Sequence, residues 1–176
     1  CASVGQTALT EAYAEVLRER GVLCGQVLLT RRDVVDRDAY LNARNTLTRL
    51  LELGAVPVVN ENDTVSVAEF TFGDNDMLGA IVSALVGADL YIILSDVDGL
   101  YTANPSVDPT ATLIPEVTQV DRSISAVAGD SSSSFGTGGM SSKVRAARGM
   151  MAAGIPTVIC EGRRPRVLLD VAEGKS

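Results

Sequence analysis

The apolar residues of the chain recur at two alternating spacings, which predict helices and short strands in turn. Across residues 7–20 the apolar side chains lie about one helical turn apart, at Ala8, Ala12, Val16 and Leu17. Such a stripe, followed by Gly21, is typical of an amphipathic helix that ends at a glycine. The next apolar segment, residues 25–30, has the length of a buried strand.

The same pairing of a helical stripe with a short apolar run continues along the chain. The spacing predicts further helices over residues 38–53, 75–86, 142–153 and 165–172. Apolar runs predict strands over residues 56–60, 90–94 and 155–160. Weaker patterns indicate a hairpin arm over residues 66–72 and a peripheral strand over residues 113–117.

Helices that alternate with short apolar strands predict an α/β fold of three layers, in which an open, mainly parallel sheet lies between helices. With 176 residues, of which 46% are hydrophobic, the chain can bury one core but is too short for two ordinary domains. We therefore expect a single domain over residues 1–176. Ligands of such sheets bind beyond the carboxyl ends of the strands, so polar residues there are the first candidates for a site.

The charged residues exclude several classes of function. The chain has 15 Lys and Arg against 22 Asp and Glu, so its formal net charge is −7 and a nucleic acid backbone would be repelled. Histidine is absent, which excludes Ser-His-Asp triads, Cys-His dyads and His-ligated zinc. Chemistry must therefore rest on carboxylates, amines, guanidinium groups, hydroxyls and the backbone.

The cysteines and the apolar runs indicate the cellular setting. The three cysteines, Cys1, Cys24 and Cys160, have no CxxC spacing, so neither a disulfide framework nor a thiolate metal site is expected. This favours a reducing, cytoplasmic environment. The most apolar stretch, residues 78–94, is interrupted by Asp89, and we find neither a membrane span nor a signal peptide.

Two polar segments lie beside predicted elements in the first half of the chain. Asn60–Asp63 lies at the carboxyl end of a predicted strand, the position of a ligand rim, although Asn and Asp also make turns and helix caps. In Gly73–Asp76, two carboxylates flank an amide directly before a predicted helix. A turn with an N-cap needs only one Asp, and neighbouring carboxylates are best tolerated where Mg²⁺ or Lys compensates their charge.

Two further segments, in the second half of the chain, point to a nucleotide. Ser95–Tyr101 follows the most buried predicted strand and begins with polar side chains suited to a phosphate or ribose, although it also contains an ordinary turn signal. Gly136–Lys143 is a glycine-rich loop that runs into a helix, so backbone amides and the Lys143 ammonium can receive a phosphate. The loop does not match the Walker A pattern, and a Ser/Gly linker with a helix cap explains it equally well by itself.

Taken together and in order, these four segments resemble the motifs of the amino acid kinase family. The resemblance also covers Val4–Gln6, Leu28–Arg31 and Leu41–Arg44, so it extends over essentially the whole chain. One such motif is a weak signal, whereas the ordered set is specific. The pair Asn60–Asp63 and Gly73–Asp76 is most similar to the branch that phosphorylates L-glutamate.

The resemblance implies a reaction and a division of labour along the chain. It implies ATP-dependent phosphorylation of the glutamate side-chain carboxylate to an acyl phosphate, the first step of proline biosynthesis. Residues 1–88 would mainly bind the amino acid, and residues 89–176 mainly ATP. Relatives of this kind are commonly cytoplasmic homo-oligomers, and proline typically inhibits them by competing around the glutamate site.

The resemblance also implies roles for individual residues. Asp63 and Asn75 match positions that bind glutamate. The positions that match nucleotide-binding residues are Ser95, Asp96, Thr137, Gly138, Gly139, Met140, Ser141, Ser142 and Lys143. Lys143 would neutralise charge on the transferring phosphoryl group, and Asp76 would orient catalytic lysines or help to hold Mg²⁺-ATP.

One feature of the family has no counterpart in this sequence. The family begins with a strand, a glycine-rich turn with a second catalytic lysine, and a substrate-binding serine loop, none of which precedes Cys1. We therefore expect an N-terminally incomplete amino acid kinase domain that is inactive, or nearly so, unless another chain supplies the segment.

Three other interpretations stay open. The first is a different enzyme of the same fold that acts on another carboxylate or on a phosphate. The second is a nucleotide-binding regulatory or storage module without catalysis. The third is the kinase half of a bifunctional enzyme in which a reductase domain follows.

Overall fold

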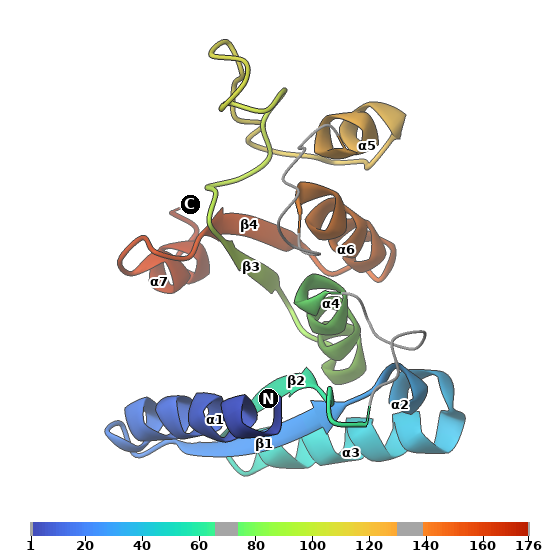
Figure 1. Ribbon diagram of the computed structural model, residues 1–176, viewed down its shortest axis with the longest axis vertical. Helices are drawn as coiled ribbons and strands as arrows, with labels where there is room; N and C mark the ends of the chain where they lie inside the picture. The colour runs from blue at the N-terminus through green and yellow to red at the C-terminus, as the bar shows by residue number, and fades with distance from the viewer. Residues whose placement is uncertain (1, 66–73, 130–138, 176) are drawn as a thin grey trace. The chain divides into compact units, whose positions relative to one another are not determined.

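The computed structural model describes residues 2–65, 74–129 and 139–175, and the chain divides into two compact units, Cys1–Ile81 and Val82–Ser176. The elements of the first unit are α1 (Ala2–Arg18), β1 (Leu23–Leu29), α2 (Arg31–Val35), α3 (Arg37–Glu52) and β2 (Ala55–Glu61) (Figure 1). Those of the second unit are β3 (Tyr91–Ser95), α5 (Arg122–Gly129), α6 (Met140–Ala152), β4 (Thr157–Glu161) and α7 (Val167–Ala172). Helix α4 (Asn75–Val86) includes the boundary between the units.

The first unit is a parallel strand pair covered by helices on both faces. Strands β1 and β2 pair in parallel from Leu23↔Ala55 to Leu29↔Glu61. A methyl group at Gly25 would lie 2.8 Å from Leu50 Cδ2, so this face of β1 meets α3. The next side chain, Gln26, donates to Thr10 Oγ1 of α1 (2.8 Å). Since successive strand residues point to opposite faces, α1 and α3 cover opposite sides, which is the expected three-layer arrangement.

Helix α3 contributes Ala43 and Leu47 to the core of this unit. Asp36 caps its N-terminus, because one carboxylate oxygen accepts from the N–H groups of Asp38 (3.1 Å) and Ala39 (3.0 Å). The helix ends before Gly54, which takes a left-handed conformation (φ +70°) that glycine adopts without a side-chain clash. Along its buried stripe, Leu47 is completely excluded from solvent.

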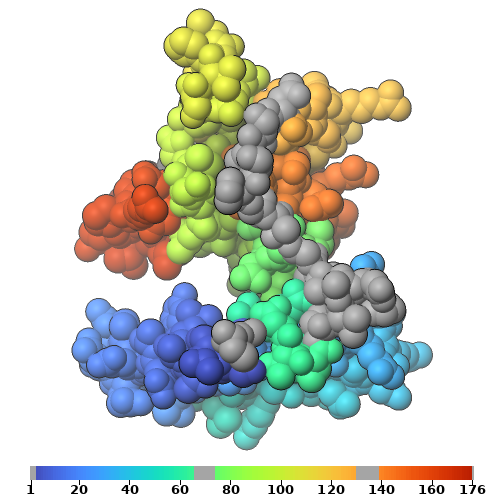
Figure 2. Space-filling view, viewed as in Figure 1, coloured from blue at the N-terminus to red at the C-terminus, as the bar shows by residue number. Residues whose placement is uncertain are grey.

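The second unit repeats the parallel pairing. Strands β3 and β4 pair from Tyr91↔Thr157 to Ser95↔Glu161, and β4 contacts both α6 and α7. Helix α7 covers the face that carries Ile92, Val158 and Cys160. The segment between β3 and α5, yellow and yellow-green in Figures 1 and 2, projects beyond the sheet of this unit.

Most expected elements are present, with shifted ends. The first helix begins at Ala2 rather than residue 7, α6 begins at Met140 rather than residue 142, and α7 begins at Val167 rather than residue 165. The strand expected over residues 113–117 is only an isolated bridge, Tyr101↔Leu113, and the expected hairpin arm over residues 66–72 lies outside the described residues. In the described parts of the chain, no helix has the length and apolar character needed to cross a membrane.

Two short helices were not expected from the apolar spacing. Helix α2 begins at a capping box, in which the Thr30 N–H and hydroxyl both donate to Asp33 Oδ2 (2.7 and 2.6 Å). Helix α5 follows Asp121, whose Oδ1 accepts from the N–H groups of Ser123 (2.9 Å) and Ile124 (3.0 Å). The Ser123 hydroxyl also donates to this oxygen (2.7 Å), and this bond, followed by the N–H bonds, holds the pKa of the Asp121 carboxyl below its usual value. Side-chain caps, rather than long apolar stripes, therefore define both helices.

The packing of α3 predicts unequal effects of two matched substitutions. Leu47 is 0% exposed and Leu51, one turn later, is 49% exposed. Leu47→Ala removes buried methyl groups and leaves a cavity, so we expect the free energy of unfolding to fall by about 3 kcal/mol. Leu51→Ala should cost less than about 1 kcal/mol. Urea unfolding followed by far-UV circular dichroism measures both, and equal losses would contradict this packing.

Candidate functional site

The carboxyl ends of β1 and β2 form a polar rim in the first unit. The two strands end level, and the Asn62 N–H extends the ladder by donating to the Leu29 carbonyl oxygen (2.8 Å). The chain then turns, with the Val65 N–H donating to the Asn62 carbonyl oxygen (3.2 Å). Asp63, predicted to bind glutamate, lies in this turn and is exposed. The parallel register therefore brings its carboxylate to the rim.

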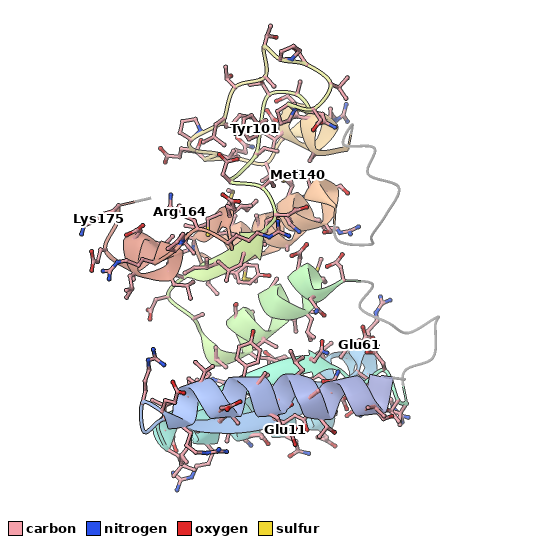
Figure 3. The ribbon with its side chains drawn as sticks, turned by 60° about the vertical axis from the view of Figure 1, so that its left-hand side comes forward. Glu11, Glu61, Tyr101, Met140, Arg164 and Lys175 are labelled. Carbon is pink, nitrogen blue, oxygen red and sulfur yellow. The ribbon has the colours of Figure 1, made fainter. Side chains whose placement is uncertain are left out.

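The first turns of α1 lie at the same rim. Ser3 Oγ lies 3.3 Å from Thr64 Oγ1, and Gln6 Nε2 donates to the carbonyl oxygen of Glu61 (3.5 Å), a residue labelled in Figure 3. The first contact joins residues that are 61 positions apart in the sequence, and the second joins residues that are 55 positions apart. Periodicity along the sequence could not place these contacts. Hydroxyl, amide and carboxylate groups thus surround the turn, and such groups can bind the ammonium and carboxylate of an amino acid.

The two carboxylates at the start of α4, Asp74 and Asp76, have different roles. Asp74 Oδ1 accepts from the Met77 N–H (2.7 Å), so Asp74 is the N-cap of α4. Asn75 is exposed and Asp76 half-buried, both in the first turn, where the helix dipole favours negative charge. Capping of the helix thus explains the Asp74 carboxylate, whereas it does not explain the Asp76 carboxylate.

The second unit has a matching rim at the carboxyl ends of β3 and β4. Ser95 pairs with Glu161, and the Gly162 N–H donates to the Ser95 carbonyl oxygen (2.8 Å). Ser95 is half-buried, and its hydroxyl donates to Oδ1 of the exposed Asp96 (3.2 Å). Both residues, predicted to bind the nucleotide, therefore lie where the strand pair ends.

The turn after Asp96 is structural. The Tyr101 hydroxyl donates to both carboxylate oxygens of Asp98 (2.9 and 3.1 Å), and this bond, together with the carboxylate charge, raises the pKa of Tyr101. A methyl group at Gly99 would lie 2.8 Å from Leu113 Cδ1, the flexible end of a side chain that is 44% exposed, so this glycine lies against Leu113. The Asp98-Gly99 pair is accounted for as a turn.

The first turn of α6 lies beside this segment. Met140, labelled in Figure 3, and Val144 pack in one cluster with Leu100, which follows β3. Gly139 is the N-cap, and the Ser142 hydroxyl donates back to its carbonyl oxygen (2.8 Å). Ser141 is exposed, while Thr137 and Gly138 lie outside the described residues. The part of the glycine-rich segment that is described thus lies near the rim of the second unit.

Lys143 is the most informative residue of this turn. Among the described residues, Ser142 (2% exposed) and Lys143 (9% exposed) are the buried polar side chains. Burying an ammonium group is costly unless hydrogen bonds or negative charge compensate it, so a buried Lys at a helix N-terminus is unusual. Together with the first amides of α6, it provides positive potential suited to a phosphate.

The described residues contain two free cysteines and no cluster of side chains suited to a metal ion. Cys24 and Cys160 are free thiols. Burial raises the pKa of the Cys160 thiol, although the charge of Arg164 opposes this shift. Within residues 2–65, 74–129 and 139–175, no group of three or more His, Cys, Asp or Glu side chains could hold a metal ion.

Known proteins match the chain in sequence over nearly its whole length. The amino acid kinase family matches the chain over residues 1–161. Glutamate 5-kinase of Trichlorobacter lovleyi is 48% identical over 174 residues, and that of Acidovorax ebreus is 51% identical over 175 residues. Each alignment covers 99% of this chain and 46% of the relative, so the chain spans about half the length of the curated relatives it matches.

A solved structure supports the fold. An X-ray structure of isopentenyl phosphate kinase is similar to the chain with a TM-score of 0.65 at 20% sequence identity. The match covers 97% of this chain and 63% of that one. At this level of identity the likeness shows the fold alone, and the fold is the three-layer α/β arrangement expected from the sequence.

The role of Asp74 as a cap predicts a stability effect without a requirement for charge. Asp74→Ala removes the acceptor for the Met77 N–H, and we expect the free energy of unfolding to fall by about 1 kcal/mol. Asp74→Asn keeps a good capping side chain and should retain most of the stability. Thermal unfolding of the three proteins measures this, and equal losses in both variants would contradict the capping role.

Proposed function

The chain belongs to the amino acid kinase family, and from this membership we propose that its protein is a glutamate 5-kinase. Such an enzyme transfers the γ-phosphoryl group of ATP to the side-chain carboxylate of L-glutamate, as the first step of proline biosynthesis. The observation that carries the proposal is that enzymes of this name match 99% of the chain at 48–51% identity. Because the chain spans 46% of their length, the proposal concerns the whole protein rather than these 176 residues alone.

The rim of the first unit supports a glutamate site. We propose that the Asp63 carboxylate binds the amino group of the substrate and that the Asn75 amide binds a carboxylate. The exposure of both side chains and the polar groups of Ser3 and Gln6 beside Asp63 favour this assignment. Residues 1–88 would thus mainly bind the amino acid.

The rim of the second unit supports a nucleotide site. We propose that Ser95, Asp96 and the segment from Thr137 to Lys143 bind ATP, so that residues 89–176 mainly hold the nucleotide. The level ends of β3 and β4 and the buried Lys143 at the start of α6 favour this assignment. The Ser142 hydroxyl is used within the helix turn, so backbone amides are the better donors to phosphate from that position.

The proposed reaction needs positioning and positive charge rather than a general base. A carboxylate with the usual Glu pKa of about 4.3 is already ionised at neutral pH. One of its oxygens attacks the γ-phosphorus, the bond to the bridging oxygen breaks in line, and ADP leaves with that electron pair. No proton moves, so the absence of histidine is no obstacle.

Two side chains would assist this transfer. The Lys143 ammonium would offset the negative charge on the transferring phosphoryl group, and Asp76 would orient cationic groups around it. Mg²⁺ bound mainly to ATP phosphates would supply further charge neutralisation. We also propose that the protein is a cytoplasmic homo-oligomer and that proline competes with glutamate.

Catalytic roles for Lys143 and Asp76 predict loss of turnover without loss of folding. The activity is best measured in a hybrid in which this chain replaces the matching segment of the Trichlorobacter lovleyi relative. In this hybrid, Lys143→Met, which keeps the apolar stem, and Asp76→Asn should each lower kcat at least about 100-fold. Trapping the acyl phosphate with hydroxylamine gives a coloured iron complex only if a carboxylate is phosphorylated.

Matched variants separate this proposal from its competitors. Asp63→Ala should raise the KM for glutamate with little change in that for ATP, and Arg148→Ala, on the exposed face of α6, should leave both unchanged. Faster turnover with another carboxylate or a phosphate substrate would favour a different kinase of this fold. ATP binding without any turnover in the hybrid would favour a non-catalytic module.

Because the chain spans only about half the length of its relatives, we expect the chain by itself to behave differently from the hybrid. We expect the 176-residue chain to form ADP from ATP and glutamate at less than about 1% of the rate of the hybrid, because the chain spans only 46% of the length of the glutamate 5-kinase that it matches. It should nevertheless bind ATP, since the proposed nucleotide residues all lie in one compact unit. A coupled ADP assay and isothermal titration calorimetry test the two statements, and robust turnover by the isolated chain would overturn the first.

A further inference from the structure

The loop that follows β4 brings a group of arginines to the rim of the second unit. The Gly162 N–H is bonded to the Ser95 carbonyl oxygen (2.8 Å), and a methyl group at Gly162 would lie 3.0 Å from Leu94 Cβ. The loop therefore begins in contact with the end of β3. Its next four residues are Arg163, Arg164, Pro165 and Arg166, and Arg164 is labelled in Figure 3.

Two of the three guanidinium groups have no hydrogen-bond or ion-pair partner in the part of the chain that the structure describes. Arg164 is 3.5 Å from Asp170 Oδ2, in an ion pair within the loop and α7. The side chains of Arg163 and Arg166 are exposed, and neither makes a hydrogen bond or ion pair with a described residue. Three of the 15 basic residues of an acidic chain thus fall within four positions, at the strand ends where ligands of this fold class bind.

Arg166 has a backbone conformation that is unfavourable for a residue with a side chain. It is the one non-glycine residue in the described part of the chain with a positive φ (63°). A side chain with a Cβ is disfavoured in this left-handed region, whereas glycine adopts it readily. The backbone conformation at this position would favour glycine. What Arg166 has that a glycine would lack is its guanidinium group, which suggests a use for that group.

We propose that Arg163 and Arg166 bind the phosphate groups of the nucleotide, as cationic contacts in addition to Lys143. This rests on the proposed nucleotide site, to which it adds two residues from a segment that no motif identified. The guanidinium fork matches the geometry of phosphate oxygens and keeps its charge at every physiological pH. Asp96 lies on the neighbouring strand end, and the two arginines offset the repulsion between its carboxylate and a phosphate.

Binding of adenine nucleotides to the full 176-residue chain tests this inference. Isothermal titration calorimetry would compare the parent with Arg163→Ala, Arg166→Ala and the double variant. We expect each single substitution to raise the Kd for ATP about fivefold, which corresponds to the upper part of the range for exposed ion pairs. The double variant should raise the Kd further. Arg148→Ala makes the same change of charge on the exposed face of α6 and should alter the Kd less than about twofold. The loss should be smaller for AMP and absent for adenosine.

A second substitution separates ligand binding from folding. Arg166→Gly removes the guanidinium group and relieves the left-handed backbone, so its Tm should equal or exceed that of the parent while ATP affinity falls as in Arg166→Ala. If the parent binds ATP and the arginine variants match Arg148→Ala, this inference is wrong and the proposed function stands. Equal losses with adenosine would also overturn it. If the parent binds no ATP, the inference and the nucleotide half of the proposed function fail together, whereas glutamate phosphorylation by the hybrid tests the rest.

Discussion

Parallel pairing with level carboxyl ends is the constraint on which both rims depend. Each unit contains one such pair, with the end residues at Leu29↔Glu61 and Ser95↔Glu161. In both, the first residue beyond the second strand donates its N–H to the last carbonyl oxygen of the first strand, at 2.8 Å. The two loops of each pair therefore leave the sheet at the same level, and polar groups far apart in sequence emerge side by side.

The alternation of helix and strand could be predicted because burial leaves a local signal. Apolar residues at helical spacing and short apolar runs located most elements, and Gly21, which has a positive φ (69°), follows the end of α1 at Arg18. Helix α2 has five residues and begins at a capping box with Asp33. Helix α5 has eight residues after the Asp121 cap, with only a short apolar stripe of Ile124, Val127 and Ala128. The expected strand at residues 113–117 is reduced to the bridge Tyr101↔Leu113, beside which the Ile114 N–H donates to the Leu100 carbonyl oxygen (2.7 Å).

The candidate site could be predicted only in part. Motif segments identified Asp63, Ser95 and Lys143, and the structure describes each at or near a strand end or helix start. The separate roles of Asp74 and Asp76 needed the cap geometry, since both carboxylates look equivalent in sequence. Contacts of Ser3 and Gln6, and the arginine loop after β4, depend on long-range pairing, for which single-sequence patterns carry no signal.

The burial of Cys160 gives the second unit a chemical reporter of its own integrity. Its thiol lies among the residues that α7 covers, and burial raises its pKa, which lowers its thiolate fraction below that of an ordinary cysteine. Because the thiolate is the reactive form, alkylating reagents should spare this sulfur while the unit is closed. Modification kinetics at this one atom would thus record how often helix α7 lifts from the strands beneath it.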